Sequence, residues 1–302
     1  MSNPDLPVEV INGIKQLEKM RGSPLVLIHS LEPLSRENVD ELDKALQGID
    51  STENLDVILH SFGGDIDAAY KMVNILRSKT KKLTIMIPSL AKSAATLITL
   101  GADEILMPLS AELGPLDSII PHPKDPQKHI SALDAFKTFE FIRNYLFESM
   151  DVAVRLFLQR GLPISDAVKN ALELVSALCH PLYTQIDPLF MGESERTLLI
   201  AEEYGKRLLE RRTAPLNKDE LINQIVRNYP SHSFVIDLNE AQRLGLNARC
   251  FPDDQLEIAA KIIENIKSES PIIYVSNMIA NEKRNVVVMQ ENKESHLEVS
   301  ST

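Results

Sequence analysis

Hydrophobic and polar positions follow two recurring patterns along the first third of the chain. Short apolar runs without alternation predict strands that are covered on both faces, and the stretches between them keep helical spacing. An amphipathic pattern over residues 1–22 predicts a leading helix, and Ser35 is placed to cap a later one. This order of strand, helix and strand predicts a largely parallel sheet with helices on both sides. The strands are expected at 25–29, 55–59, 83–87 and 104–107, and the later helices at 67–78 and 93–100.

The pattern changes after about residue 116. Three prolines within 121–126 predict a loop, because proline removes a backbone donor and restricts the residue before it. Residues 133–209 keep helical spacing, with breaks expected at Gly161–Pro163 and at His180–Pro181, and a mixed segment follows from 217 to 266. The expected organisation is a leading helix (1–22), a core (23–132), a helical extension with a short mixed α/β segment (133–275) and a disordered tail (276–302).

Composition narrows the class of protein. The 302 residues are 44% hydrophobic and carry a net charge of -11, opposite in sign to a general nucleic-acid binder. Two distant cysteines give neither a disulfide framework nor a zinc motif, and no apolar stretch has the length of a membrane span. We therefore expect a cytoplasmic protein without a metal, a cofactor, a nucleic-acid partner or a membrane anchor.

Two short motifs carry the candidate chemistry, and each lies where a predicted strand passes into a helix. The first is Ser61-Phe62-Gly63-Gly64-Asp65, and the second, about thirty residues later, is Ala91-Lys92-Ser93-Ala94-Ala95. Taken singly, a Gly-Gly pair is more typical of a turn, and a serine at a helix start is more typical of an N-cap. If the two turns are neighbours, the N–H groups of Gly64 and Ala94 converge beside Ser93. That pair would form an oxyanion hole next to a nucleophile, which favours acyl transfer and, most plausibly, peptide hydrolysis.

The same residues carry a resemblance to a known family. The run His60–Ile66 resembles the "N-S-P-G-G" glycine motif of the Clp protease and crotonase superfamily, and Ala91–Ile105 resembles its serine motif. Glu112–Asp117 is similar to the "L-G-P-x-D-P-Q" run of the branch called serine dehydrogenase proteinases, which is related to signal-peptide peptidase A. Similarity continues at Ile186–Leu189 and Ala201–Gly205, so the resemblance spans about residues 23–250.

This resemblance implies a fold and an activity. The fold would be a Clp/crotonase-type α/β spiral of parallel βαβ units with a helical C-terminal extension. The activity would be that of a serine endopeptidase acting on proteins or peptides, without ATP dependence of its own. Ser93 would be the nucleophile, with Gly64 and Ala94 as oxyanion donors. Relatives form rings or stacked trimers, so a homo-oligomer is implied, with the helices of 133–209 as candidates for its interface. The chain departs from the family pattern at Phe62, where proline is usual, and after Asp117, where Ser-Ile replaces Pro-Gln.

The general base lies outside both motifs. The histidine that the Clp subunit uses would fall near Gly114, where this chain has none. His122, a few residues later, is one alternative. Lys137 is favoured as the base of a Ser–Lys dyad, because it lies among apolar residues at a similar distance after the serine as in the peptidase relatives. Lys92 is adjacent to Ser93, and neighbours on a helix do not face each other, so binding or steering fits it better.

Two other classes of function stay open. A crotonase-type acyl-CoA enzyme would use the same oxyanion hole without a serine nucleophile, although Ser93 and the lack of a basic patch for the nucleotide disfavour it. A non-catalytic assembly or regulatory subunit is the other alternative, and it would explain why the sequence does not clearly identify a general base.

Overall fold

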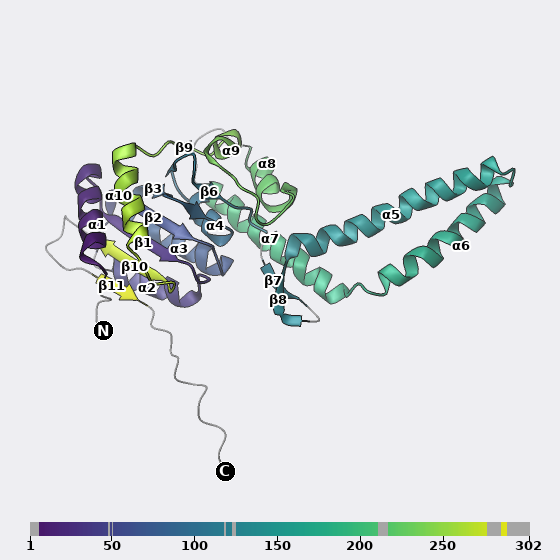
Figure 1. Ribbon diagram of the computed structural model, residues 1–302, viewed down its shortest axis with the longest axis horizontal. Helices are drawn as coiled ribbons and strands as arrows, with labels where there is room; N and C mark the ends of the chain where they lie inside the picture. Colours follow the sequence, from purple (N-terminus) through teal and green to yellow (C-terminus); the bar gives the residue numbers. More distant parts are fainter. Residues whose placement is uncertain are drawn as a thin grey trace, which may run out of the picture. The chain divides into compact units, whose positions relative to one another are not determined.

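A computed structural model describes residues 6–47, 49, 51–117, 119–122, 125–210, 217–276 and 285–288. The chain divides into two compact units (Figure 1). Residues 1–116 and 201–302 form the first, which contains the sheet, and residues 117–200 form the second. The boundaries expected from the sequence at residues 22, 132 and 275 stay predictions.

The first unit contains most of the secondary structure. Its N-terminal part comprises α1 (Val8–Arg21), β1 (Leu25–Ser30), α2 (Arg36–Leu46), β2 (Thr52–Ser61), α3 (Ile66–Ser78), β3 (Thr80–Met86), β4 (Leu90–Ala91), α4 (Ala94–Leu100), β5 (Glu104–Leu106) and β6 (Glu112–Leu113). Its C-terminal part comprises α8 (Lys218–Asn223), the π-helical turn η1 (Gln224–Asn228), α9 (Leu238–Arg243), β9 (Ala248–Arg249), α10 (Asp253–Glu264), β10 (Ile272–Ser276) and β11 (Asn285–Val288). The helix α7 (Pro188–Glu210) begins in the second unit and ends in the first.

The strands form one sheet in the order β11-β10-β1-β2-β3-β5-β9. The strands β1, β2, β3, β5 and β9 run parallel to one another, and β1, the main length of β2 and the end of β3 are buried. The short strands β4 and β6 extend the sheet as a branch that starts at the carboxyl end of β2. The expected α/β fold of parallel βαβ units is therefore confirmed, and each expected strand of the core overlaps an observed one.

Helix capping follows the residues that the sequence offers. Ser35 begins α2 as expected, and its backbone N–H donates to Oδ1 of Asn38 at 2.8 Å. Asp65 begins α3, because its Oδ1 accepts the N–H of Asp67 at 2.8 Å and that of Ala68 at 3.3 Å. Both helices therefore start immediately after the turns at the carboxyl ends of β1 and β2.

The C-terminal part of the chain returns to the sheet, which the sequence did not predict. The strand β10 pairs antiparallel with β1 along its whole length, and β11 pairs antiparallel with β10. The helices α1 and α10 lie side by side over this region (Figure 1). They pack closely because Gly13 leaves room for Ile262, whose Cγ1 would lie 2.8 Å from a Cβ at that position. Tyr274, Leu17 and Phe251 are fully buried in the same core.

The second unit begins with a two-stranded ribbon where a loop was expected. β7 (Ile119–His122) and β8 (Asp125–Ser131) pair antiparallel, with an irregularity between Pro121 and His122. The prediction of a loop over 121–126 was wrong, because both strands of such a ribbon are edges. A proline at an edge can turn its missing donor away from the partner strand.

A long helical hairpin follows the ribbon. It consists of α5 (Ala132–Gln159) and α6 (Ile164–Tyr183), joined by a turn in which Gly161 has a φ of 86°. The expected break at Gly161–Pro163 is confirmed, but the one at His180–Pro181 is not. Pro181 lies inside α6, close enough to its end that few backbone hydrogen bonds are disturbed, and the helix ends two residues later.

Most of the expected disordered tail, 277–284 and 289–302, lies outside the described residues. Within the described part of the chain, no helix combines the length and the apolar character needed to cross a membrane.

Candidate active site

The glycine turn between β2 and α3 has a conformation that only glycine adopts readily. Gly63 and Gly64 have φ values of 102° and 144°. The carbonyl of Gly63 accepts the N–H of Leu34 at 2.8 Å, and the N–H of Asp65 donates to the carbonyl of Leu34 at 2.8 Å. A Cβ on Gly64 would lie 2.2 Å from the nitrogen of Leu34. The turn is therefore fixed against the segment after β1, a contact that no motif in the sequence indicated.

The serine turn before α4 is strained. Ser93 has φ 50° and ψ −123°, and it is the one non-glycine residue with a positive φ in the described part of the chain. Such a conformation costs on the order of 1–3 kcal/mol and tends to occur at functional sites. The carbonyl of Ser93 accepts the N–H of Thr96 at 2.8 Å, which starts α4 directly after it. A sharp turn from strand to helix that leaves a serine partly exposed has the geometry of a nucleophile elbow.

The two turns are in direct contact. The strands β2 and β4 run parallel, and the N–H of Lys92 donates to the carbonyl of Ser61 at 2.9 Å. A Cβ on Gly63 would lie 2.8 Å from Cβ of Ser93 and 2.9 Å from the nitrogen of Ala94. The geometry therefore brings the predicted nucleophile and the glycine turn together.

Two backbone donors remain available at this contact. Among the described residues, neither the N–H of Gly64 nor that of Ala94 has a hydrogen-bond acceptor. Ala94 is the first residue of α4, where the helix leaves its N–H groups unpaired and its dipole favours negative charge. The contact can therefore accommodate an oxyanion next to a serine hydroxyl.

Lys92, which precedes the serine, is held by its own partners. Its Nζ lies 3.0 Å from Oε1 of Glu112 and 3.3 Å from the carbonyl oxygen of Leu113, and its side chain is only 13% exposed. The side chain of Lys92 lies against Gly114, where an added Cβ would lie 2.7 Å from Cδ of Lys92. Lys92 therefore ties the serine turn to β6, which fits a positioning role better than proton abstraction from Ser93.

A buried histidine pair lies directly before the glycine turn. His29 and His60 face each other on β1 and β2, with their Nδ1 atoms 3.1 Å apart and their rings stacked. Burial lowers the pKa of both histidines, and for His60 burial and the proximity of His29 together lower the pKa to about 4. The sequence analysis named His60 only as the first residue of the glycine motif and assigned His29 no role. Both strands end in the dipeptide His-Ser, at 29–30 and 60–61, and this repetition could have indicated the pair.

The two candidate bases lie in the second unit. Lys137 is on the second turn of α5 with an exposed side chain, and His122 is the last residue of β7, partly exposed. A lysine that acts as a base needs apolar surroundings, and the described chain alone does not provide them for Lys137. The assignment of either residue as the base stays a prediction.

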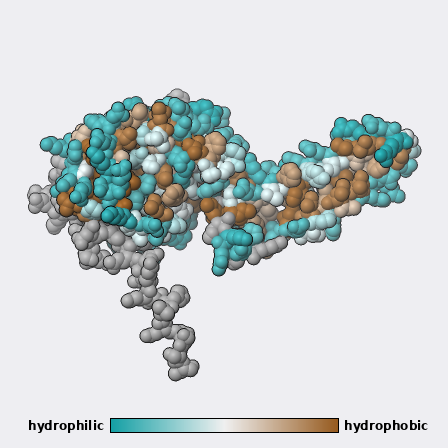
Figure 2. All heavy atoms as spheres, viewed as in Figure 1, coloured by the Kyte–Doolittle hydropathy of each residue, from teal (hydrophilic) through white to brown (hydrophobic). Residues whose placement is uncertain are grey.

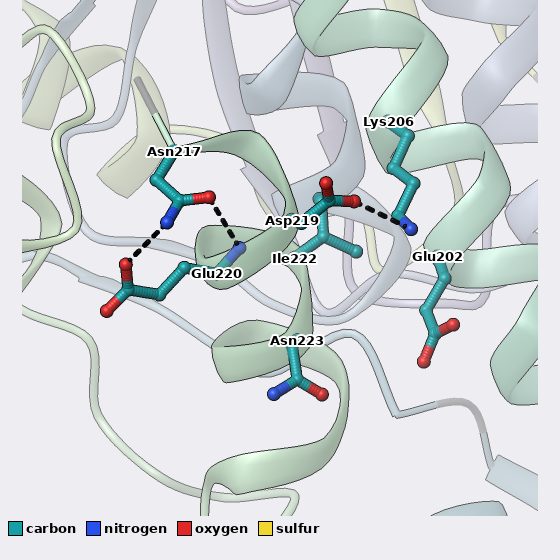
Figure 3. A pocket seen from close by; sticks show the side chains of 7 residues that line it. All are labelled: Glu202, Lys206, Asn217, Asp219, Glu220, Ile222 and Asn223. Carbon is teal, nitrogen blue, oxygen red and sulfur yellow. Dashed lines mark hydrogen bonds and ion pairs between the residues drawn. The ribbon is translucent and has the colours of Figure 1, made fainter. Parts of the chain in front are cut away.

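A separate hollow of about 530 Å³ lies between α7 and α8 in the first unit (Figure 3). Its polar groups already have partners: Nζ of Lys206 lies 2.9 Å from Oδ1 of Asp219, Asn217 donates to Glu220 at 2.8 Å, and Glu202 pairs with Arg227. Its lining therefore presents ordinary surface ion pairs rather than convergent reactive groups. Nowhere in the described ranges do three or more His, Cys, Asp or Glu side chains form a potential metal site.

Part of this chain is similar to known proteins. Residues 10–136 match the model of a family described as ClpP-like SDH-type serine proteinase. Two uncharacterized proteins of Methanocaldococcus jannaschii match 116 residues at 31% and 28% identity, which is 34% of this chain. The match spans 40% and 41% of their own lengths.

Two solved structures are also similar. One is ClpP1 from Listeria monocytogenes, at 14% identity and a TM-score of 0.41, over 80% of this chain and 98% of that one. The other is the 1510-N membrane-bound stomatin-specific protease in complex with a substrate peptide, at 16% identity and a TM-score of 0.29, with the same coverage. These likenesses are too distant to carry a conclusion about activity. The match supports the family resemblance read from the motifs over residues 10–136, where the chain is similar to the ClpP-like SDH-type serine proteinases.

Proposed function

We propose that this protein is a serine endopeptidase that hydrolyses peptide bonds without ATP dependence of its own. The observation that carries the proposal is the contact between the glycine turn and the strained Ser93 turn. The positive φ of Ser93 costs conformational free energy, and a catalytic role best explains why this strained turn lies beside two unpaired N–H groups. The match of residues 10–136 to the model of a serine proteinase family supports the same class of reaction.

The proposed reaction is acyl transfer in two steps. Oγ of Ser93 attacks the peptide carbonyl carbon while a base takes its proton, and the N–H groups of Gly64 and Ala94 stabilise the oxyanion. The base then gives the proton to the leaving amine, and water releases the acyl group from Ser93 by the reverse route. Each oxyanion donor is expected to contribute about 10²–10³-fold in kcat.

Lys137 is the proposed base, with His122 as the alternative. Lys137 lies between Phe136 and Phe141 on α5, and it needs apolar surroundings that remove water from it before it can act as a base. Lys92 is not proposed, because Glu112 and a backbone carbonyl already engage its Nζ. The natural substrate would be a protein or peptide, and a cytoplasmic location stays a prediction.

Labelling with a fluorophosphonate probe tests the nucleophile. The wild-type protein should be labelled at Ser93, and Ser93→Ala should abolish both the labelling and the cleavage of casein. Ser89→Ala is a matched control, since this exposed serine precedes β4 and should leave both signals intact. Labelling that survives Ser93→Ala would show that another residue is the nucleophile.

Single substitutions of the two candidate bases test the dyad. Lys137→Ala should reduce cleavage by at least about 10²-fold, whereas His122→Ala should have little effect. The reverse result would assign the base to His122. An absence of cleavage by the wild-type protein under all conditions would favour an assembly or regulatory subunit, and turnover of an acyl-CoA would favour the crotonase-type alternative.

A further inference from the structure

The helix α7 carries the motif Ala201–Gly205, which lies outside the candidate active site. Ala201, Gly205 and Leu208 are buried and lie about one helical turn apart, so this stripe packs inside the first unit, whereas Glu203 is exposed. Hydrophobic and hydrophilic residues are likewise interspersed on the visible face of the first unit (Figure 2). This part of α7 therefore acts through individual contacts within the unit.

Tyr204 of this motif contacts two residues near the start of α3. Its hydroxyl donates to Oδ1 of Asp67 at 2.8 Å, and its ring stacks on that of Tyr70, with centroids 4.2 Å apart and an angle of 5° between the planes. The hydrogen bond to Asp67, together with burial and the charge of that carboxylate, raises the pKa of Tyr204, so the hydroxyl keeps the proton that it donates. Nη2 of Arg36, the first residue of α2, lies 3.4 Å from Oδ2 of Asp67. Asp67 is therefore a point at which α2, α3 and α7 are joined.

The first turn of α3 continues directly from the glycine turn. Asp67 lies three residues after Gly64, and the carboxylate of Asp65 between them accepts the N–H groups of residues 67 and 68. A shift at the start of α3 therefore moves the N–H of Gly64, which is one of the two proposed oxyanion donors. Catalytic geometry tolerates displacements of only about 0.5 Å, so a contact that fixes this turn affects the proposed reaction.

The next residue on α7 lies near the helix that follows the serine turn. A Cβ on Gly205 would lie 2.4 Å from Cδ1 of Ile222 on α8 and 3.6 Å from Cδ1 of Leu100, the last residue of α4. The helix α4 begins at Ala94, whose N–H is the other proposed donor. The helices α3 and α4 also pack directly on each other. Consecutive residues of α7 therefore lie against both of the helices that follow the two turns.

We propose that Tyr204 is a positioning residue that holds the start of α3, so that the N–H of Gly64 converges with that of Ala94 on one oxyanion. The inference rests on the proposed function, because the two donors matter only in acyl transfer. A ring that stacks on Tyr70 and donates to the charged Asp67 one turn away restrains the helix against both sliding and rotation. An ordinary surface contact would add stability alone, and the two roles differ in what a conservative variant changes.

Amide exchange resolved to single residues tests this contact without any need for activity. The N–H groups of Leu34 and Asp65 pair across the glycine turn, so their exchange reports whether that turn opens. Tyr204→Phe keeps the ring but removes the hydroxyl, and it should accelerate the exchange of both amides at least about threefold. The matched control is Tyr229→Phe, because Tyr229 also donates to a carboxylate, that of Glu240, and stacks on an aromatic ring, but lies on neither α3 nor α7. The control should leave exchange at the glycine turn unchanged.

Steady-state cleavage of a peptide substrate separates positioning from simple stabilisation. An oxyanion donor acts in the transition state, so Tyr204→Phe should lower kcat at least about fivefold and leave KM within about twofold of the wild-type value. Because Tyr204 and Asp67 act through one hydrogen bond, the double variant Asp67→Ala with Tyr204→Phe should be no slower than Asp67→Ala alone. Tyr229→Phe should keep both kinetic constants even where it lowers the unfolding temperature.

The outcomes distinguish this proposal from the proposed function. Unchanged exchange of Leu34 and Asp65 in Tyr204→Phe would overturn the proposal, whatever the protein catalyses. A loss of cleavage that Tyr229→Phe reproduces would overturn it too, and so would effects of Asp67→Ala and Tyr204→Phe that add independently in the double variant. Accelerated exchange in a protein that neither cleaves peptides nor reacts with the fluorophosphonate would support Tyr204 as the residue that holds the turn and refute the proposed function alone.

Discussion

The substitution Gly63→Ala probes the contact between the two turns most directly. An added Cβ would lie 2.7 Å from the carbonyl oxygen of Lys92, 2.8 Å from Cβ of Ser93 and 2.9 Å from the nitrogen of Ala94. None of these three atoms is the far end of a flexible side chain, so the methyl group cannot be accommodated by a rotamer change. Either the serine turn or the glycine turn must move.

The structure gives the size of the effect. Ordinary carbon contacts begin near 3.4 Å, so relief requires a displacement of about 0.5–0.7 Å, beyond the roughly 0.5 Å that catalytic geometry tolerates. Losing one oxyanion donor costs about 10²–10³-fold. The positive φ of 102° adds about 1–2 kcal/mol of destabilisation on its own. The second-order rate constant for labelling of Ser93 should therefore fall at least about 100-fold.

Gly22→Ala provides the control for backbone strain. Gly22 also lies in the first unit and has a φ of 64°, but an added Cβ there would meet no atom within 4 Å. Both variants should unfold at lower temperature than the wild type, but only Gly63→Ala should lose labelling. A folded Gly63→Ala protein that reacts within about threefold of the wild-type rate would refute the argument that the two turns form one site.

Three further predictions concern Lys92, the histidine pair and the cap of α5. Lys92→Met leaves the carboxylate of Glu112 without its ammonium partner, so urea denaturation should show a loss of about 1–3 kcal/mol, with partial recovery in Lys92→Arg; an unchanged midpoint would contradict the positioning role. Because the pKa of His60 is lowered to about 4 and that of His29 is also lowered, the unfolded chain binds more protons than the folded one between pH 6.5 and 4. Stability is therefore complete above pH 6.5 and should fall by about 2 kcal/mol by pH 5, and His60→Gln should flatten this slope. Ser131→Ala removes the cap whose Oγ accepts the first N–H groups of α5, and amide exchange in that turn should accelerate about fivefold, whereas an unchanged rate would show that the cap is dispensable.

The sequence predicted the parts of the fold that are encoded locally. Strands at 25–29 and 55–59 have continuous apolar runs, and the turns after them carry residues that only a turn or a cap requires, such as Gly63 and Ser35. Because parallel strands place their carboxyl ends at one edge, two turns one repeat apart had to lie near each other. The contact between the turns followed from that rule, whereas the positive φ of Ser93 has no signature in composition or spacing.

The features that sequence reasoning missed depend on pairing between distant segments. β10 is separated from β1 by more than 240 residues, and the five residues of β10 do not indicate which strand it pairs with. The ribbon over 119–131 was interpreted as a loop because the effect of proline depends on whether a strand is central or at an edge, which the partner decides. His29 escaped notice for the same reason, since its significance comes from lying opposite His60.

The proposed nucleophile and the proposed base differ in what determines their reactivity. Ser93 takes its conformation from contacts with neighbouring turns between residues 34 and 114, all within one unit, so a motif can mark it. The side chain of Lys137 is exposed on α5, and a lysine becomes a base only when water is removed from around it. The reactivity of such a lysine depends on what surrounds it in the folded protein, and its neighbours in sequence do not determine that. The glycine and serine motifs therefore mark the proposed nucleophile and oxyanion donors but leave the base unassigned.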